Sequence, residues 1–286
     1  MQRLGLKVFC EKCVGLVVCV VALALAGVAS AGERPRFLPC AERDFSELFA
    51  EHKLTGAIAF YEPGADSLIC YNAARVDSAY LPASTFKIFN SLVALHTGVI
   101  SSPDEVIPWD SVARGWDKWD MDQTLRSAFT YSAVWYYQVL ARRIGEERMQ
   151  LWVDSVGYGN RDISGGIDLF WLEGGLRMTL RLQLDLLVRL YHNDLPFSAE
   201  VCDTVKSIMI REETDSYTLR GKTGWAQRFE PQIGWFVGYV TRGADVVFFA
   251  TNFSERDPGS GFTRRGIALT MDALRALNFL PPGVGK

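Results

Sequence analysis

The stretch LPASTFK, residues 81–87, opens the first long helical pattern of the chain and governs how the rest is interpreted. Ser84 and Lys87 stand three positions apart, so a helix places both on one face, within hydrogen-bonding reach. Pro82 marks the helix start, where the helix dipole favours negative charge. A serine hydroxyl becomes a nucleophile when a base removes its proton, and burial can lower the pKa of a lysine enough for that task. Taken alone, the pair also fits an ordinary solvated helix face.

Two further motifs follow at wide separation along the chain. SAV, residues 132–134, begins with Ser132, which is suited to pass a proton between Lys87 and a leaving group; a helix N-cap is its alternative role. KTG follows a strand-like pattern and begins at Lys222. On an edge strand, the lysine attracts a substrate carboxylate, Thr223 hydrogen-bonds it, and Gly224 lets the backbone approach closely. A turn at the end of a strand is the alternative for this tripeptide.

Strand patterns near both ends of the chain enclose a helical middle. Alternation predicts strands over 56–61, 67–71, 217–222, 233–241 and 246–253, the first two paired around a turn at 62–64. Helical spacing predicts helices over 44–52, 84–100, 133–144, 146–156, 179–191 and 264–277. The pattern predicts an α/β (α+β) fold, an antiparallel sheet flanked by helices with an inserted, mostly helical lobe. The expected α/β part spans 32–83 and 206–286, and the helical part spans 84–205.

The first 31 residues have the pattern of a secretory signal peptide. Basic residues precede an apolar run over 14–28, and the small residues Ala29-Ser30-Ala31 follow it. An uncleaved anchor helix is the alternative, but the run is short for a membrane span. We therefore expect a secreted, periplasmic protein whose mature domain spans 32–286 and which has no membrane association after cleavage.

Three cysteines, Cys40, Cys70 and Cys202, lie beyond the signal peptide, so at most one internal pair can form. An exported protein meets oxidising conditions, and Cys40 with Cys70 is the preferred pair because both lie in the N-terminal segment. No histidine or cysteine cluster has metal-ligand spacing, so no metal is expected. The 30 basic and 33 acidic residues nearly balance, which gives no indication of nucleic-acid or membrane-surface binding.

The three motifs are far more specific in this order than each is alone. Ser-x-x-Lys and Lys-Thr-Gly recur together in penicillin-recognising enzymes. With YGN at 158–160 and the stretch SGGID–FWLEG over 164–174, the chain resembles the class D, or OXA-type, serine β-lactamases over nearly its whole mature length. The Tyr-Gly-Asn element and Val134 are particular to this class, since related transpeptidases usually have asparagine in place of the valine.

The resemblance implies four catalytic residues: Ser84, Lys87, Ser132 and Trp171. Ser84 is implied to open the ring of a small-molecule β-lactam and to become acylated. Lys87 is implied to carry carbon dioxide as N6-carboxylysine, which acts as general base in acylation and deacylation; no cofactor beyond carbon dioxide or bicarbonate is expected. Burial makes this reasonable, because only a neutral amine attacks carbon dioxide. The indole N–H of Trp171 is implied to donate to the resulting carbamate.

The resemblance also implies how substrate is bound. The backbone N–H groups of Ser84 and Trp225 would form an oxyanion hole. Arg264 would bind the substrate carboxylate with Thr223, and Arg265 is the alternative by one position. The other implied substrate-binding residues are Trp119, Val134, Leu172, Lys222 and Gly224. The rival functions are a penicillin-binding transpeptidase or carboxypeptidase and a non-hydrolysing β-lactam sensor domain, and both a monomer and a homodimer stay open.

Overall fold

The structure, a computed structural model, describes residues 34–282, so the predicted signal peptide lies outside the described residues. A single seven-stranded sheet has the order β1-β3-β2-β7-β6-β5-β4. Its strands are β1 (Cys40–Glu42), β2 (Thr55–Tyr61), β3 (Leu68–Tyr71), β4 (Ile210–Glu213), β5 (Thr218–Ala226), β6 (Gln232–Arg242) and β7 (Asp245–Glu255). The predicted class of fold is confirmed, with one correction: β1 runs parallel to β3, so the sheet is mixed. Only three residues long, β1 is too short to show alternation in the sequence.

The N-terminal and C-terminal strands meet in the middle of this sheet. Residues 55–61 of β2 pair antiparallel with residues 248–254 of β7, and β7 continues through β6 into β5. The hairpin predicted over 56–71 is confirmed as β2 and β3, which pair antiparallel. KTG lies inside β5 and not in a turn after it, because β5 continues to Ala226.

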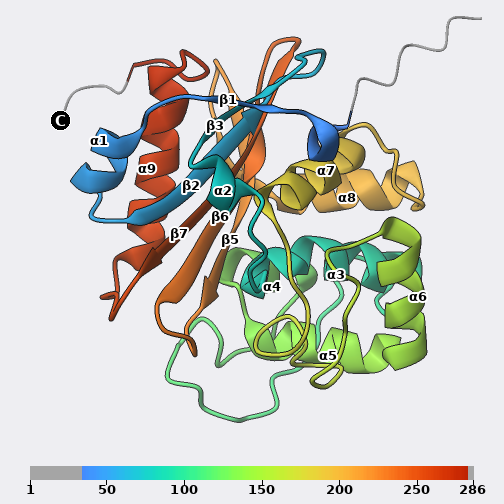
Figure 1. Ribbon diagram of the computed structural model, residues 1–286. Coiled ribbons are helices and arrows are strands. Elements are labelled where there is room, and N and C mark those ends of the chain that lie inside the picture. Colours follow the sequence, from blue (N-terminus) through green and yellow to red (C-terminus); the bar gives the residue numbers. More distant parts are fainter. Residues whose placement is uncertain (1–33, 283–286) are drawn as a thin grey trace, which may run out of the picture. The chain divides into compact units, whose positions relative to one another are not determined.

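Helices cover both faces of the sheet (Figure 1). α1 (Ser46–Glu51) and α9 (Phe262–Ala276) lie on one face, and α7 (Leu180–Tyr191) and α8 (Ala199–Ile208) lie on the other. α3 (Phe86–His96), α4 (Leu125–Tyr131), α5 (Val134–Ile144) and α6 (Glu146–Val156) group together beside the second face. The predicted helix over 84–100 divides into a 3₁₀ turn, η2 (Ala83–Thr85), and α3. The sequence patterns missed α4, α8 and three short elements: β4, α2 (Ala73–Val76) and η1 (Pro35–Phe37).

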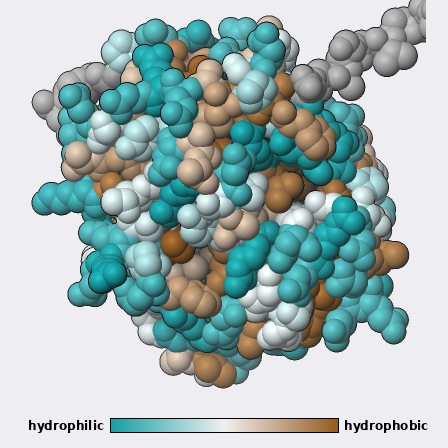
Figure 2. Space-filling model, in the orientation of Figure 1, coloured by the Kyte–Doolittle hydropathy of each residue, from teal (hydrophilic) through white to brown (hydrophobic). Residues whose placement is uncertain are grey.

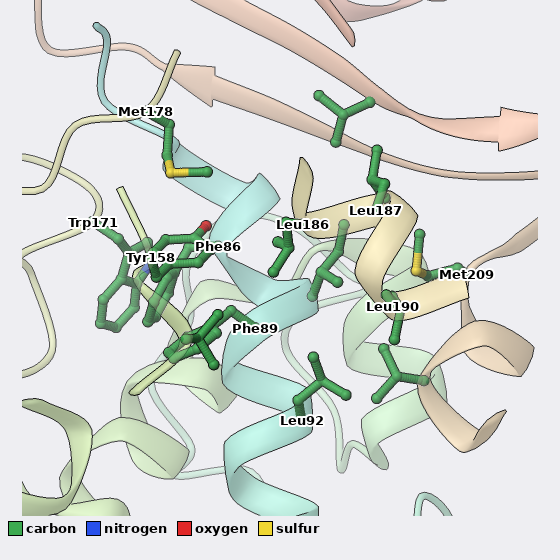
Figure 3. Packing of buried hydrophobic residues seen from close by; sticks show 14 of the residues in the cluster. Phe86, Phe89, Leu92, Tyr158, Trp171, Met178, Leu186, Leu187, Leu190 and Met209 are labelled. Carbon is green, nitrogen blue, oxygen red and sulfur yellow. The ribbon is translucent and has the colours of Figure 1, made fainter. Parts of the chain in front are cut away.

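The larger of the two main hydrophobic clusters surrounds α3. Figure 3 shows Phe86, Phe89 and Leu92 projecting from this helix into a group that includes Tyr158 and Trp171. All five side chains are buried, and burying such large apolar groups is the main stabilising term in folding. The face of the molecule in Figure 2 is mostly hydrophilic, with hydrophobic residues scattered in small groups.

The predicted disulfide is confirmed: Cys40 and Cys70 are bonded, with their Cα atoms 5.8 Å apart. The bond joins β1 to β3 at the edge of the sheet, while Cys202 is a buried free thiol in α8. Within residues 34–282, no helix is both long enough and apolar enough to cross a membrane.

Candidate active site

Ser84 lies in η2, two residues before α3 begins at Phe86, and so near the helix start that the sequence predicts. Four hydrogen bonds hold this turn. The Trp235 indole donates to the carbonyl of Leu81 (2.8 Å), and the backbone N–H of Ala83 donates to the carbonyl of Trp171 (3.0 Å). The Thr85 hydroxyl donates to the carbonyl of Pro82 and accepts from the buried Gln183 amide of α7, both at 2.8 Å.

These bonds fix a strained backbone beside the nucleophile. Ala83 has φ of +47°, in the left-handed region that residues other than glycine rarely adopt. Such a conformation costs on the order of 1–2 kcal/mol and persists where surrounding contacts over-determine it. The strain fixes the direction of the next residue, Ser84, whose side chain is only partly buried.

Lys87 is fully buried, and its Nζ lies 2.7 Å from Ser84 Oγ. Burial lowers the pKa of Lys87 from 10.5 to about 7, because desolvation disfavours the ammonium. The Nζ also lies 5.2 Å from the centre of the Tyr137 ring, whose hydroxyl bonds Ser91 deeper in the core. An amine in this position is partly neutral near pH 7 and can accept a proton from the serine.

Ser132 and Lys222 form a second hydroxyl–amine pair. Ser132 has φ of +57° and ends α4, so its alternative role as the N-cap of the next helix does not apply; Ala133 has that position. Lys222 is 2 % exposed, and its Nζ donates to Ser132 Oγ (3.1 Å) and to the carbonyl of Thr223 (3.2 Å). Burial lowers the pKa of Lys222, and the positive charges of Lys87 and Arg211 lower it further. The two lysines are thus close enough to influence each other.

Because side chains alternate along β5, successive residues of KTG point to opposite faces of the sheet. Gly224 pairs with Trp235, which packs in the cluster around α3, whereas Thr223 pairs with Phe236, which packs in the cluster under α9. Trp225 lies on the same face as Thr223, and its ring centroid is 5.5 Å from that of Phe262 in α9.

The glycine itself is explained by packing within the protein. A Cβ on Gly224 would lie 2.8 Å from the carbonyl oxygen of Pro82 and 3.2 Å from Cγ2 of Thr85. Only a residue without a side chain lets β5 approach the serine turn this closely. The sequence suggested an approach to substrate; the structure shows an approach to η2.

Trp171 is fully buried and carries an unused hydrogen-bond donor. Its ring stacks on Phe86, with centroids 4.9 Å apart and planes 24° from parallel, so α3 fixes its orientation. Its Nε1 has no hydrogen-bond partner among the described residues. An unsatisfied buried donor costs about 1–3 kcal/mol, so the site favours an added acceptor. An anionic group on Lys87 would suit this donor, and the residues present fit N-carboxylation.

The YGN residues, 158–160, contact both α3 and the loop that carries Trp171. Tyr158 is buried against Phe89, with ring centroids 4.6 Å apart. The Asn160 side chain donates to the carbonyl of Gly175 (2.9 Å) and accepts from the backbone N–H of Arg177 (2.9 Å). The motif therefore supports the architecture of the site.

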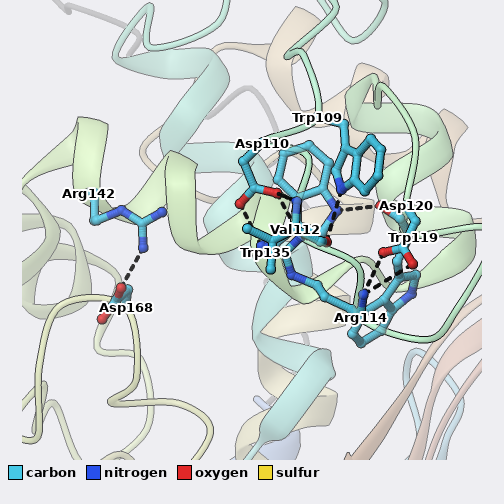
Figure 4. A network of polar contacts seen from close by, with 9 residues as sticks. All are labelled: Trp109, Asp110, Val112, Arg114, Trp119, Asp120, Trp135, Arg142 and Asp168. Carbon is cyan, nitrogen blue, oxygen red and sulfur yellow. Dashed lines mark hydrogen bonds and ion pairs between the residues drawn. The ribbon is translucent and has the colours of Figure 1, made fainter.

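The loop before α4 carries Trp109 and Trp119, and polar contacts tie it to Trp135 of α5 (Figure 4). The Trp119 indole donates to the carbonyl of Tyr131, the residue before Ser132, at 2.9 Å. The carbonyl of Trp119 accepts from the Trp135 indole at 2.8 Å. Arg114 braces the loop by bonding Asp110 through its guanidinium and Asp120 through its backbone.

Two of the apolar residues implied for substrate binding lie close in the chain to candidate catalytic residues. Val134 begins α5 two residues after Ser132, and Leu172 follows Trp171; both are half-buried. Arg228 is exposed and forms an ion pair with Glu173, the residue after Leu172.

The structure favours Arg264 over Arg265 as the arginine that can take a ligand. Arg265 bonds Glu255 and the carbonyls of His52 and Lys53 (3.1 and 3.2 Å). Arg264 is exposed in the first turn of α9 and has no hydrogen bond or ion pair with another residue of 34–282. The Phe262–Trp225 contact places this turn beside the KTG strand.

The sequence analysis missed Ala83, Gln183 and Trp235, which hold the serine turn. One of them had a signal: Gln183 interrupts the leucines of α7, and a polar residue on an apolar helix face is expected to have a partner. Within the described part of the chain, no group of three or more His, Cys, Asp or Glu residues could hold a metal ion.

Comparison with known proteins agrees with this geometry. Residues 31–270 match the family model described as the penicillin binding protein transpeptidase domain. Beta-lactamase OXA-48 of Klebsiella pneumoniae is 40% identical over 234 residues, which cover 82% of this chain and 87% of the relative. Two solved structures are similar. The class D β-lactamase YbXI from Nostoc is 46% identical with a TM-score of 0.80, covering 83% of this chain and 99% of its own.

The second is FUS-1 (OXA-85), a class D β-lactamase from Fusobacterium nucleatum subsp. polymorphum. It is 36% identical with a TM-score of 0.78, and the match covers 82% of this chain and 98% of that one. Each match covers more than four fifths of this chain and nearly all of the solved structure. The chain belongs to the class D, OXA-type serine β-lactamases, within the penicillin-binding protein transpeptidase fold.

Proposed function

We propose that the protein hydrolyses the β-lactam ring of penicillin-type antibiotics through an acyl-enzyme on Ser84. The observation that carries the proposal is the 2.7 Å contact between Ser84 Oγ and the buried, pKa-lowered Lys87 amine. At pH 7 about half of such an amine is neutral, against roughly one part in 3,000 for an exposed lysine. The neutral amine is the form that can react with carbon dioxide. In its N-carboxylated form, Lys87 takes the serine proton while Ser84 attacks the lactam carbonyl.

The oxyanion that forms needs donors in place beforehand. The backbone N–H of Ser84, at the start of the 3₁₀ turn, and that of Trp225, at the end of the KTG strand, are assigned to this role. Lys222 holds Ser132 at 3.1 Å, so Ser132 is suited to pass a proton to the nitrogen that leaves when the ring opens. Thr223 and Arg264 are assigned to the substrate carboxylate.

Deacylation requires a base that can activate water. A carboxylated Lys87 would supply an anionic oxygen as the general base of both half-reactions. Two features support this modification: the neutral fraction of the Lys87 amine, and the Trp171 Nε1 donor that has no partner within 34–282. Trp171 holds the added group by donating this N–H. An anion on Lys87 would in turn favour the protonated form of the neighbouring Lys222, whose pKa burial and the charges of Lys87 and Arg211 lower.

Trp119, Val134 and Leu172 are assigned to the apolar walls of the substrate site.

We also propose export to the periplasm, which the Cys40–Cys70 disulfide supports because such bonds persist in oxidising compartments.

The decisive experiment is penicillin turnover by the mature protein in bicarbonate buffer. We expect many turnovers per Ser84, and Ser84→Ala should abolish them. A stoichiometric burst that ends in a stable acyl-enzyme would instead indicate a sensor domain or a penicillin-binding transpeptidase. The acyl-enzyme is measured by mass spectrometry of the intact chain, so the outcomes are distinguishable.

A further inference from the structure

A hollow of about 390 Å³ lies between the sheet and the helices α7 and α8. Its walls come from the ends of α7 and β4, from α8, and from the facing side chains of β5 and β6. It shares no lining residue with the proposed active site. Arg220 of β5 and Thr241 of β6 contribute to its floor, at the part of the β5–β6 pairing away from Gly224.

Arg220 is the uncompensated charge in this hollow. It forms no ion pair with any residue of 34–282, and its Nη1 makes one long bond, of 3.4 Å, to Thr241 Oγ1. Its Nε is buried and has no hydrogen-bond partner among the described residues. A buried donor of a charged group that is left unsatisfied costs free energy, which an acceptor bound in the hollow would relieve. The guanidinium carbon lies 5.7 Å from the Tyr239 ring centroid, and this packing fixes its position.

The other charges of the hollow compensate each other. Lys206 Nζ lies 2.7 Å from Asp203 and also donates to Asn193 Oδ1 (3.0 Å) and to the carbonyl of Tyr191 (3.3 Å). The lysine thus has an acceptor for each of its three protons, and the aspartate is neutralised by it. One net positive charge, that of Arg220, remains to attract an anion.

The apolar walls indicate what else the ligand carries. The rings of Tyr191 and Tyr239 meet edge to face at 5.4 Å, and Ile210 is 38% exposed at the mouth. A hollow of about 390 Å³ is within the range of small-molecule sites and larger than one inorganic anion requires.

We propose that this hollow is a binding site for a small organic carboxylate with a flat apolar body. The carboxylate accepts hydrogen bonds from Arg220, and the Thr241 hydroxyl lies beside it as a further donor. The body packs against Tyr191, Tyr239 and Ile210. The proposal is independent of the β-lactamase activity.

The test is calorimetric titration of the folded protein with benzoate. We expect one saturable site with a dissociation constant on the order of 1 mM, as befits a ligand of few atoms. Arg220→Gln should weaken binding at least tenfold. Arg242→Gln, which removes one exposed arginine from the same part of the sheet, should leave it unchanged. Ser207→Trp, from an exposed position on the rim, should fill the hollow and also abolish binding.

Several results would overturn the proposal. One is the absence of saturable benzoate binding to the wild type. Another is wild-type affinity in Ser207→Trp, which reports on the hollow even where Arg220→Gln fails to fold. Loss of binding in Arg264→Gln, with Arg220→Gln unaffected, would place the benzoate in the proposed active site. Inorganic phosphate that binds as tightly as benzoate would contradict the role of the apolar walls.

Discussion

Replacing Trp171 by phenylalanine removes one hydrogen-bond donor and reduces the buried indole to a single phenyl ring. The phenyl ring keeps the stacking on Phe86, where the indole centroid now lies at 4.9 Å, and stays buried. What disappears is the Nε1 proton, which has no partner within the described chain. The substitution therefore separates the role of Trp171 as a donor to carboxylated Lys87 from its role in packing.

The expected magnitude follows from that single bond. A hydrogen bond to a charged group contributes about 1.5–3 kcal/mol, and 1.4 kcal/mol is a factor of ten. The bicarbonate concentration that gives half-maximal activity should therefore rise roughly 10- to 150-fold in Trp171→Phe. Without bicarbonate, the free energy of unfolding should change by no more than about 1–2 kcal/mol, because the lost apolar contact is offset by removal of an unsatisfied donor.

The assay measures initial rates of penicillin hydrolysis while bicarbonate is added back to enzyme stripped of carbon dioxide at low pH. Trp152→Phe is the matched control, since Trp152 stacks on Phe197 (4.9 Å) in another part of the core. Half-saturation by bicarbonate that is the same in Trp171→Phe and wild type would refute the assigned role of the indole. Activity that does not depend on bicarbonate at all would refute carboxylation of Lys87.

Three further predictions use the same site. Between pH 7 and 10.5 the unfolded chain binds a proton at Lys87 that the native state does not, so wild-type stability should rise with pH by up to about 1.4 kcal/mol per pH unit. Lys87→Met should lose the part of this rise that Lys87 contributes and keep the part due to Lys222, whose pKa burial also lowers. The free energy of unfolding of Lys87→Met should therefore exceed that of the wild type most at pH 7 and below, as urea unfolding without carbon dioxide would reveal. Gly224→Ala should slow acylation at least tenfold and destabilise the fold by about 1–3 kcal/mol, because its Cβ would lie 2.8 Å from a backbone oxygen of the serine turn. Gly259→Ala is the control, since there is open space around Gly259. An acylation rate in Gly224→Ala equal to that of the wild type would contradict the packing argument. Arg264→Gln should raise KM for penicillin with little change in melting temperature, whereas Arg265→Gln should lower the melting temperature; the reverse pattern would exchange their roles.

Local periodicity explains why much of the fold could be predicted from the sequence. The helix predicted over 146–156 has those bounds in α6. The strands predicted over 217–222, 233–241 and 246–253 correspond to β5, β6 and β7, with ends that differ by one to four residues. These segments are long enough to show their period, and their apolar faces point into one core. β1 and α2 were missed because three or four residues show no period.

The candidate site also has features that the sequence predicts and features that it does not. Ser84 and Lys87 are three residues apart, so helical geometry alone predicts their contact, and the sequence determined it. Burial of Lys87, which lowers its pKa, depends on the packing of other segments around α3. From the sequence alone this burial is an expectation and not a result.

Contacts across the chain were decided by the tertiary structure. Ser132 and Lys222 are 90 residues apart, and they meet because the left-handed end of α4 lies against β5. The unused donor of Trp171 exists because its ring is clamped against α3 in a position that no spacing rule gives. The sequence by itself determined which chemical groups are present and which neighbours share a turn. Only the packing of helices and strands decided which groups meet, because burial, charge and hydrogen bonding act through space and not along the chain.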